Sequence, residues 1–131
     1  GNVVEVPVSP GVRTEPGLVV YRFGVGLFYA NATRFSDEVL ALVDVPEPPR
    51  WFVLLADAMD DVDFTGGKTM LELAEQLADR NVVFCVASAG RIMPELERFG
   101  VVEAIGVGHV FASVDDAIAA FHSAAPSTGD A

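Results

Sequence analysis

The side chains that could do chemistry gather in one short stretch of this chain, between residues 57 and 69. An apolar run, 51–56, precedes the stretch and a helical pattern follows it, which places it between a buried strand and a helix N-terminus. Free backbone N–H groups point out of a helix N-terminus, so α/β proteins place ligands and switches there. We therefore expect function to centre on this loop. Its polar and small residues are Asp57, Asp60, Asp61, Asp63, Thr65, Gly66, Gly67, Lys68 and Thr69.

The run Gly67-Lys68-Thr69 before a helix is similar to the end of a phosphate-binding P-loop. That loop needs a further glycine five residues before its second glycine, so that backbone amides can wrap the phosphates. Val62 stands at that position, and the neighbouring Asp63 would repel a phosphate. We interpret Lys68 as a solvated residue in the first turn of the helix.

The segment 61–65 matches the aspartate pair of haloacid-dehalogenase phosphatases, in which the first aspartate attacks phosphorus and the pair holds Mg²⁺. In those enzymes the pair directly follows its strand, and a lysine and a second acidic pair come later. Here several residues follow Ala56 before the pair, and Lys68 is the only lysine of the chain. The loop also lacks the glycine and terminal glutamate of a calcium loop. We expect a solvated acidic loop without a metal or a catalytic group, and keep the phosphatase as a third alternative.

Composition restricts the class of protein further. The chain has 131 residues, of which 51% are hydrophobic, and a formal net charge of −11. This length supports one domain with a substantial core. The acidity argues against nucleic acid and anionic lipid as partners. No apolar run approaches the length of a membrane span and no signal peptide is recognisable, so we expect a cytosolic domain.

The single cysteine, Cys85, lies in an apolar run that predicts a strand, 81–87. A lone thiol in such a run is most often part of the core, and one cysteine excludes an internal disulfide. We therefore expect Cys85 to be buried and inert.

Hydrophobic periodicity and turn residues predict an α/β fold. The sheet is expected to be mixed but largely parallel, with about five to six strands, an antiparallel hairpin at one side and about four to five helices. Residues 1–123 form the predicted domain, and 124–131 have the composition of a flexible tail. Strands are predicted at 3–8, 18–23, 27–29, 51–56, 81–87, 104–107 and 110–111. Helices are predicted at 31–43, from about 66 to 78, and from Ser113 to about 121, and a further short helix has Pro94 near its first turn and Gly100 at its end. Residues 44–50 are a proline-rich connector.

The order of these motifs resembles STAS domains, a family named for sulfate transporters and anti-sigma-factor antagonists. The resemblance extends from Leu18 to about Phe121. Residues 27–32 are close to the leucine-tyrosine-phenylalanine-alanine-asparagine-alanine run of STAS domains in SulP transporters. Asp63-Phe64-Thr65-Gly66 stands where the family has aspartate, two small hydroxyl residues and glycine. Further matches are Leu71-Glu72-Leu73-Ala74, Leu96-Glu97-Arg98-Phe99-Gly100 and Asp115-Asp116-Ala117.

The resemblance implies the cytosolic regulatory and interaction domain of a SulP-type sulfate or anion transporter, at the cytoplasmic face of the cell membrane. It implies no enzyme activity and no cofactor. The partners it implies are the transmembrane domain of the same transporter and, as a further candidate, a second copy. The alternative is a nucleotide-sensing module for GTP, GDP or ATP. In that case the amides of Gly66, Gly67 and Lys68 would take the phosphates, with Lys68 or Arg91 as charge partner.

The resemblance also draws attention to Phe64 and Thr65. In the anti-sigma-factor antagonists, a kinase phosphorylates a serine directly after the motif aspartate. Phe64 stands there and cannot accept phosphate, while Thr65 keeps a hydroxyl one place later. We interpret Thr65 as the N-cap of the helix, which stabilises by about 1 kcal/mol. A phosphorylated Thr65 is the alternative.

Overall fold

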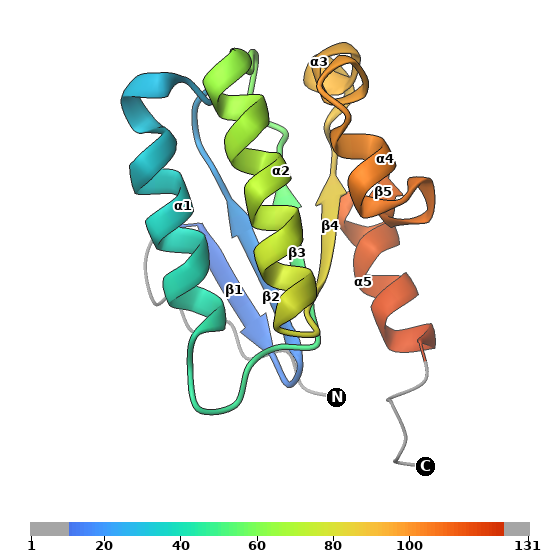
Figure 1. Ribbon diagram of the computed structural model, residues 1–131. Coiled ribbons are helices and arrows are strands. Elements are labelled where there is room, and N and C mark those ends of the chain that lie inside the picture. The colour runs from blue at the N-terminus through green and yellow to red at the C-terminus, as the bar shows by residue number, and fades with distance from the viewer. Residues whose placement is uncertain (1–10, 125–131) are drawn as a thin grey trace.

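The computed structural model describes residues 11–124, which form a mixed sheet with helices on both faces (Figure 1). Within this range the sheet has five strands in the order β1-β2-β3-β4-β5. The first two strands form an antiparallel hairpin at one edge, and the other neighbouring pairs are parallel. The predicted fold class is therefore confirmed. The strands are β1 (Val12–Glu15), β2 (Leu18–Arg22), β3 (Trp51–Leu55), β4 (Val83–Ala87) and β5 (Val110–Phe111).

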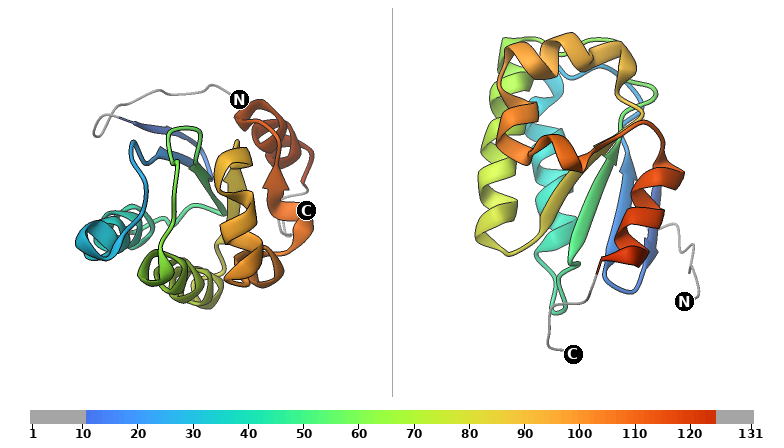
Figure 2. Two further views of the ribbon diagram at one scale, coloured as in Figure 1. Left: turned by 90° about the horizontal axis from the view of Figure 1, so that it is seen from above. Right: turned by 90° about the vertical axis from the view of Figure 1, so that its right-hand side faces the viewer.

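Two long helices cover one face of the sheet, and the last helix packs on the opposite face (Figure 2). Two short helices follow one another beyond the end of β4, and single turns of 3-10 helix, η1 (Gly90–Ile92) and η2 (Val107–His109), flank them. The helices are α1 (Tyr29–Val43), α2 (Phe64–Asp79), α3 (Met93–Arg98), α4 (Val101–Ile105) and α5 (Val114–Ser123).

The larger core lies under α1 and α2. Their buried residues recur at helical spacing and pack over Tyr21, Phe52 and Phe84 of the sheet. A smaller core lies under α5 and includes Cys85. Burial raises the pKa of the Cys85 thiol to about 12, so the thiol is protonated at neutral pH and has the inert environment that was predicted. The central strands are apolar on both faces because helices cover both.

The structure differs from the predicted elements at three places. Residues 12–15 form β1, although two flanking turn signals hid this strand; Gly17, with φ of 84°, makes the turn into β2. Leu27 forms only an isolated bridge, and the predicted strand 27–29 ends where α1 begins. The predicted strand 104–107 is wrong: residues 104–105 end α4, which starts directly after Gly100 with its φ of 82°, and Val107 begins η2. A short apolar run in a sequence does not by itself distinguish a strand from a helix.

The other predicted helices and strands within residues 11–124 are confirmed, and almost all of them begin and end within two residues of the predicted bounds. The last helix begins as expected, since the Ser113 side chain accepts a hydrogen bond from the Asp116 N–H at 3.1 Å. The predicted strand 3–8 and nearly all of the predicted tail, 125–131, lie outside the described residues.

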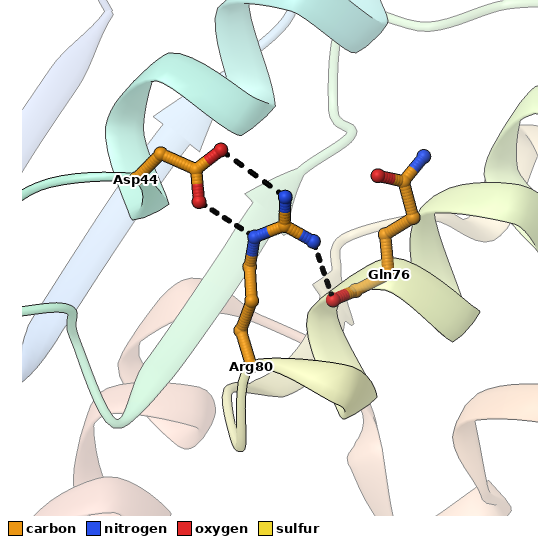
Figure 3. Close-up of polar contacts among 3 residues, drawn as sticks. All are labelled: Asp44, Gln76 and Arg80. Atoms are coloured by element: carbon orange, nitrogen blue, oxygen red, sulfur yellow. Dashed lines mark hydrogen bonds and ion pairs between the residues drawn. The ribbon is translucent and has the colours of Figure 1, made fainter.

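A bidentate ion pair joins the C-terminal ends of α1 and α2 (Figure 3). Arg80 donates from Nε to Asp44 Oδ1 at 2.6 Å and from Nη2 to Asp44 Oδ2 at 3.1 Å. Its remaining nitrogen, Nη1, donates to the Gln76 carbonyl at 2.9 Å, which fixes the guanidinium in place. The hydrogen bond from Arg80 lowers the pKa of the Asp44 carboxyl below its ordinary value. A hydrogen bond from the Tyr21 hydroxyl to the Glu38 carboxylate also joins α1 to the sheet.

We predict that Arg80→Gln destabilises the chain in a pH-dependent way. A carboxyl with a lowered folded-state pKa contributes stability above its unfolded pKa, and this contribution is lost as the pH falls through the folded pKa. The difference in urea midpoint between the wild type and Arg80→Gln should therefore be largest near neutral pH and shrink in acid. Arg91→Gln, at an exposed arginine, is the control and should change little. A difference independent of pH would mean that the bond to Gln76 carries the effect.

Candidate functional site

The predicted loop lies at the edge of the sheet where β2 and β3 end. Two loops meet there, one leading from β2 into α1 and one from β3 into α2 (Figure 1). A parallel bridge pairs Leu27 with Val62. The Leu27 N–H donates to the Asp61 carbonyl at 3.0 Å, and the Asp63 N–H donates to the Leu27 carbonyl at 3.0 Å. The two loops therefore form one hydrogen-bonded unit beside the N-termini of both helices.

The Asp63 carboxylate connects the two helix N-termini. Its Oδ1 accepts a hydrogen bond from the Gly66 N–H at 2.7 Å, and its Oδ2 accepts one from the Tyr29 N–H at 3.0 Å. Gly66 lies in the first turn of α2, and Tyr29 is the first residue of α1. One negative charge therefore lies at the positive ends of two helix dipoles, where it stabilises both.

Asp63, not Thr65, is the N-cap of α2, so the predicted capping role of Thr65 is wrong. A capping residue has extended backbone angles and precedes the first helical residue. Asp63 has φ of −83° and ψ of −179°, whereas Phe64 and Thr65 are already helical. The hydroxyl pattern of the family placed the expected start of the helix two residues too late.

Asn31 closes the turn that leads into α1. Its Oδ1 accepts a hydrogen bond from the Phe28 N–H at 2.8 Å, and its Nδ2 donates to the Gly26 carbonyl at 2.9 Å. These bonds satisfy the N–H of the N-cap residue, Phe28, and a carbonyl of the turn before the helix. The asparagine in the 27–32 run therefore has a structural role at the same edge of the sheet.

Gly66 and Gly67 serve close packing. A Cβ on Gly66 would lie 2.6 Å from the Leu27 carbonyl oxygen, and one on Gly67 would lie 2.5 Å from the ring of Phe99. Their amides, which were expected to be exposed to a phosphate, are both used: Gly66 donates to the Asp63 side chain, and Gly67 donates to the Asp63 carbonyl at 2.9 Å. The expectation of free amides at these two glycines is therefore wrong.

The remaining predicted residues are distributed around this edge. Lys68 is exposed on the second turn of α2, and Arg91 is exposed in η1, after β4. Asp57 forms an ion pair with Arg22 at 2.9 Å, with both side chains about half exposed. Asp60 and Asp61 are exposed. Among residues 11–124, no three acidic, histidine or cysteine side chains come together in a way that could hold a metal ion.

The sequence did not reveal a group of exposed apolar side chains at this edge, which we call the aromatic edge: Val25, Phe28, Tyr29 and Phe64. In the described part of the chain, six large apolar side chains are exposed, and four of them belong to this group. Tyr29 and Phe64 are the most exposed of the four, at 77% and 72%. Each is the first residue of its helix, and the Asp63 carboxylate holds the two helix starts together. Clustered exposed apolar side chains of this kind are typical of contact surfaces.

Two hollows lie elsewhere on the molecule. A groove of about 540 Å³ lies at the opposite edge of the sheet, between the β1–β2 hairpin and the proline-rich connector. A smaller hollow of about 390 Å³ lies between α2 and α4. Neither is lined by a residue of the predicted loop or of the aromatic edge.

The fold and this edge define a STAS domain, and the chain belongs to the STAS domain family, whose pattern matches residues 9–117. It is 35% identical over 114 residues to a probable sulfate transporter of Mycobacterium tuberculosis, a match that covers 86% of this chain and 20% of that protein. The chain thus spans about a fifth of the length of the curated relatives it matches.

Solved structures show the same architecture. A sulfate transporter family protein of Wolinella succinogenes is 26% identical, with a TM-score of 0.74, and the match covers 90% of this chain and 96% of that one. A putative anti-sigma factor antagonist of Thermotoga maritima is 11% identical with a TM-score of 0.73, and the match covers 85% of this chain and 92% of that one. At that identity the second likeness concerns the fold alone.

We predict that Asp63→Ala destabilises the chain by about 1–2 kcal/mol, because it removes the cap of α2 and a partner of α1. Thr65→Ala should change the stability by less than about 0.5 kcal/mol, since Thr65 is not the cap. Urea midpoints of the two variants provide the measurement, with Asp61→Ala as a control for the loss of one loop carboxylate. Equal losses in Thr65→Ala and Asp63→Ala would contradict the assignment of the cap.

We also predict that Gly66→Ala and Gly67→Ala lower the thermal midpoint, although alanine favours helices over glycine by about 1 kcal/mol. Gly66→Ala should cost more, because it meets a backbone carbonyl that cannot move away, whereas Gly67→Ala meets a ring that can shift. Gly90→Ala is the matched control, since nothing lies within 4 Å of its Cβ position. A rise in midpoint for Gly66→Ala would rule out the close packing.

Proposed function

We propose that this chain is the cytosolic regulatory and interaction domain of a SulP-type sulfate or anion transporter. The observation that carries the proposal is the 35% identity to a probable sulfate transporter that is about five times as long as the match. A piece of that size with its own hydrophobic core suits a domain that acts by contact. Its proposed partner is the transmembrane part of the same polypeptide, at the cytoplasmic face of the membrane. No helix within residues 11–124 is long and apolar enough to span a membrane.

The arrangement of the loop supports a role that is not enzymatic. Catalytic carboxylates need access to a substrate and a partner that tunes them. Here Asp63 accepts hydrogen bonds from two backbone amides, and Asp57 is paired with Arg22. Of the two aspartates that a phosphatase would use, Asp61 and Asp63, the second is already engaged in holding the two helix starts together.

The contact role is also better supported than nucleotide sensing. A phosphate at the start of α2 would need free amides there. The amides of Gly66 and Gly67 already have partners, and the carboxylate of Asp63 lies at the position that an anion would prefer. Lys68 is exposed, but the Asp63 carboxylate at the same helix start would repel a phosphate.

We expect that removing residues 11–124 from the full-length protein changes sulfate uptake severalfold. The measurement is the uptake of labelled sulfate into proteoliposomes that contain equal amounts of inserted protein, with and without this domain. Size-exclusion chromatography of both proteins controls for misfolding of the membrane part. Equal uptake rates per inserted protein would contradict a regulatory role.

A further inference from the structure

We propose that the contact between His122 and Glu15 is a proton-dependent latch, which holds the last helix, α5, against the β1–β2 hairpin more firmly when the imidazole is charged. His122 lies in the last turn of α5, and Glu15 is the last residue of β1. The two residues are 107 positions apart, so the contact fastens the end of the described chain to its beginning. The latch is a property of the domain itself and does not depend on the proposed function.

The contact consists of one short hydrogen bond. The Nε2 atom of His122 lies 2.5 Å from Oε2 of Glu15. An ionised carboxylate only accepts hydrogen bonds, so Nε2 carries the proton and donates it. A neutral imidazole keeps this hydrogen bond, whereas a protonated imidazole adds the attraction between two opposite charges. A second proton on the ring therefore strengthens the contact without changing its geometry.

The burial of Glu15 makes this added attraction stronger than it is at an ordinary surface site. The Glu15 side chain is only 6% exposed, while that of His122 is 46% exposed. Ion pairs between fully exposed side chains contribute little, because water screens them. A carboxylate that is largely removed from water is screened less and needs a partner that offsets its lost hydration. The half-exposed imidazole remains accessible to protons from the solvent.

The position of His122 within α5 also favours the charged imidazole. The last carbonyl groups of a helix carry partial negative charge, so a cation in the last turn is stabilised there. Both effects act only while the end of α5 is in place. The contribution of the charged His122 is therefore fully present at low pH and is lost as the pH rises through the range in which histidine titrates, about pH 5 to 8.

Two arginines at the same junction act against the charging of His122. Arg50, directly before β3, places its guanidinium over the Phe121 ring, 4.7 Å from the ring centroid. Arg13 lies two residues before Glu15, on the same face of β1. The His122 imidazole contacts the Glu15 carboxylate directly, so we expect attraction to dominate. The acidic residues of α5 are in its first turn, at the opposite end of the helix.

The latch lies beside the main apolar anchor of α5. Phe121 is 3% exposed and belongs to the smaller core, which also contains Cys85. Its ring packs edge-to-face on Trp51 at 5.7 Å, and a Cβ on Gly17 would lie 3.2 Å from it. Release of the latch therefore loosens the cover of this core. A helix of ten residues is marginal on its own in water, so a released α5 would lose its helical hydrogen bonds.

Hydrogen exchange of the 131-residue chain at pH 6 and pH 8 tests the latch. Rates are divided by the intrinsic rates at each pH, and the amides of α2 are the internal reference for an intact fold. We expect the protection of α5, relative to α2, to fall roughly fivefold from pH 6 to pH 8. His122→Gln, which cannot become charged, should show the lower protection at both pH values.

Two further variants sharpen the test. His109→Gln changes the other histidine of the chain, which lies in η2, and should keep the wild-type difference. Glu15→Gln keeps a hydrogen-bond acceptor but removes the negative charge, so the difference should shrink to the part due to the helix end, about twofold.

Three results would overturn the latch. The first is equal relative protection of α5 at pH 6 and pH 8 in the wild type. The second is a pH difference that persists in His122→Gln. The third is a loss of protection in α2 as large as that in α5, because the whole fold would then respond to pH. None of these results bears on the proposed function, which depends on the change in sulfate uptake when residues 11–124 are removed.

Discussion

The Asp63 carboxylate is the interaction on which this edge of the structure depends. A single side chain accepts hydrogen bonds from the first turn of α2 and from the first residue of α1. It therefore sets the distance between two helices that are far apart in the sequence. The same contact brings the loops after β2 and β3 together, since Asp63 also donates its backbone N–H to the Leu27 carbonyl. Close packing of Gly66 against that carbonyl allows the loops to approach so nearly.

Much of the fold could be predicted from the sequence because its signals are local. Phe35, Val39 and Val43 recur at helical spacing, the apolar run after Arg50 predicts a doubly covered strand, and Ser113 marks a helix start. The strand β1 was missed because its four residues stand between two turn signals, and its identity depends on pairing with β2. The pairing of two strands depends on the folded chain, so a local sequence pattern does not reveal it.

The structure places the predicted loop at an end of the sheet, but it gives several of the loop residues other partners than the sequence indicated. The loop between β3 and α2 stood out because acids and glycines follow an apolar run. The pattern could not show that Asp63 reaches Tyr29, 34 residues away, or that Gly66 faces Leu27. The exposed Phe28 and Tyr29 were hidden inside an apparent strand, because hydrophobic residues in a sequence indicate a core unless the backbone is known. Asn31 was the signal that could have revealed them, because a polar side chain at the third position of a helix can bond back to the N-cap residue, here Phe28.

The ion pair between Arg80 and Asp44 has a mechanical consequence when it is considered together with Asp63. The first joins α1 to α2 at their C-terminal ends, and the second joins them at their N-terminal ends. Because α1 and α2 are joined at both ends, they cannot slide along each other or separate unless one of these sets of hydrogen bonds breaks. We therefore expect the two helices to move as one rigid body relative to the sheet. A displacement of either helix start would then also move the residues at the other end, where the proline-rich connector follows α1.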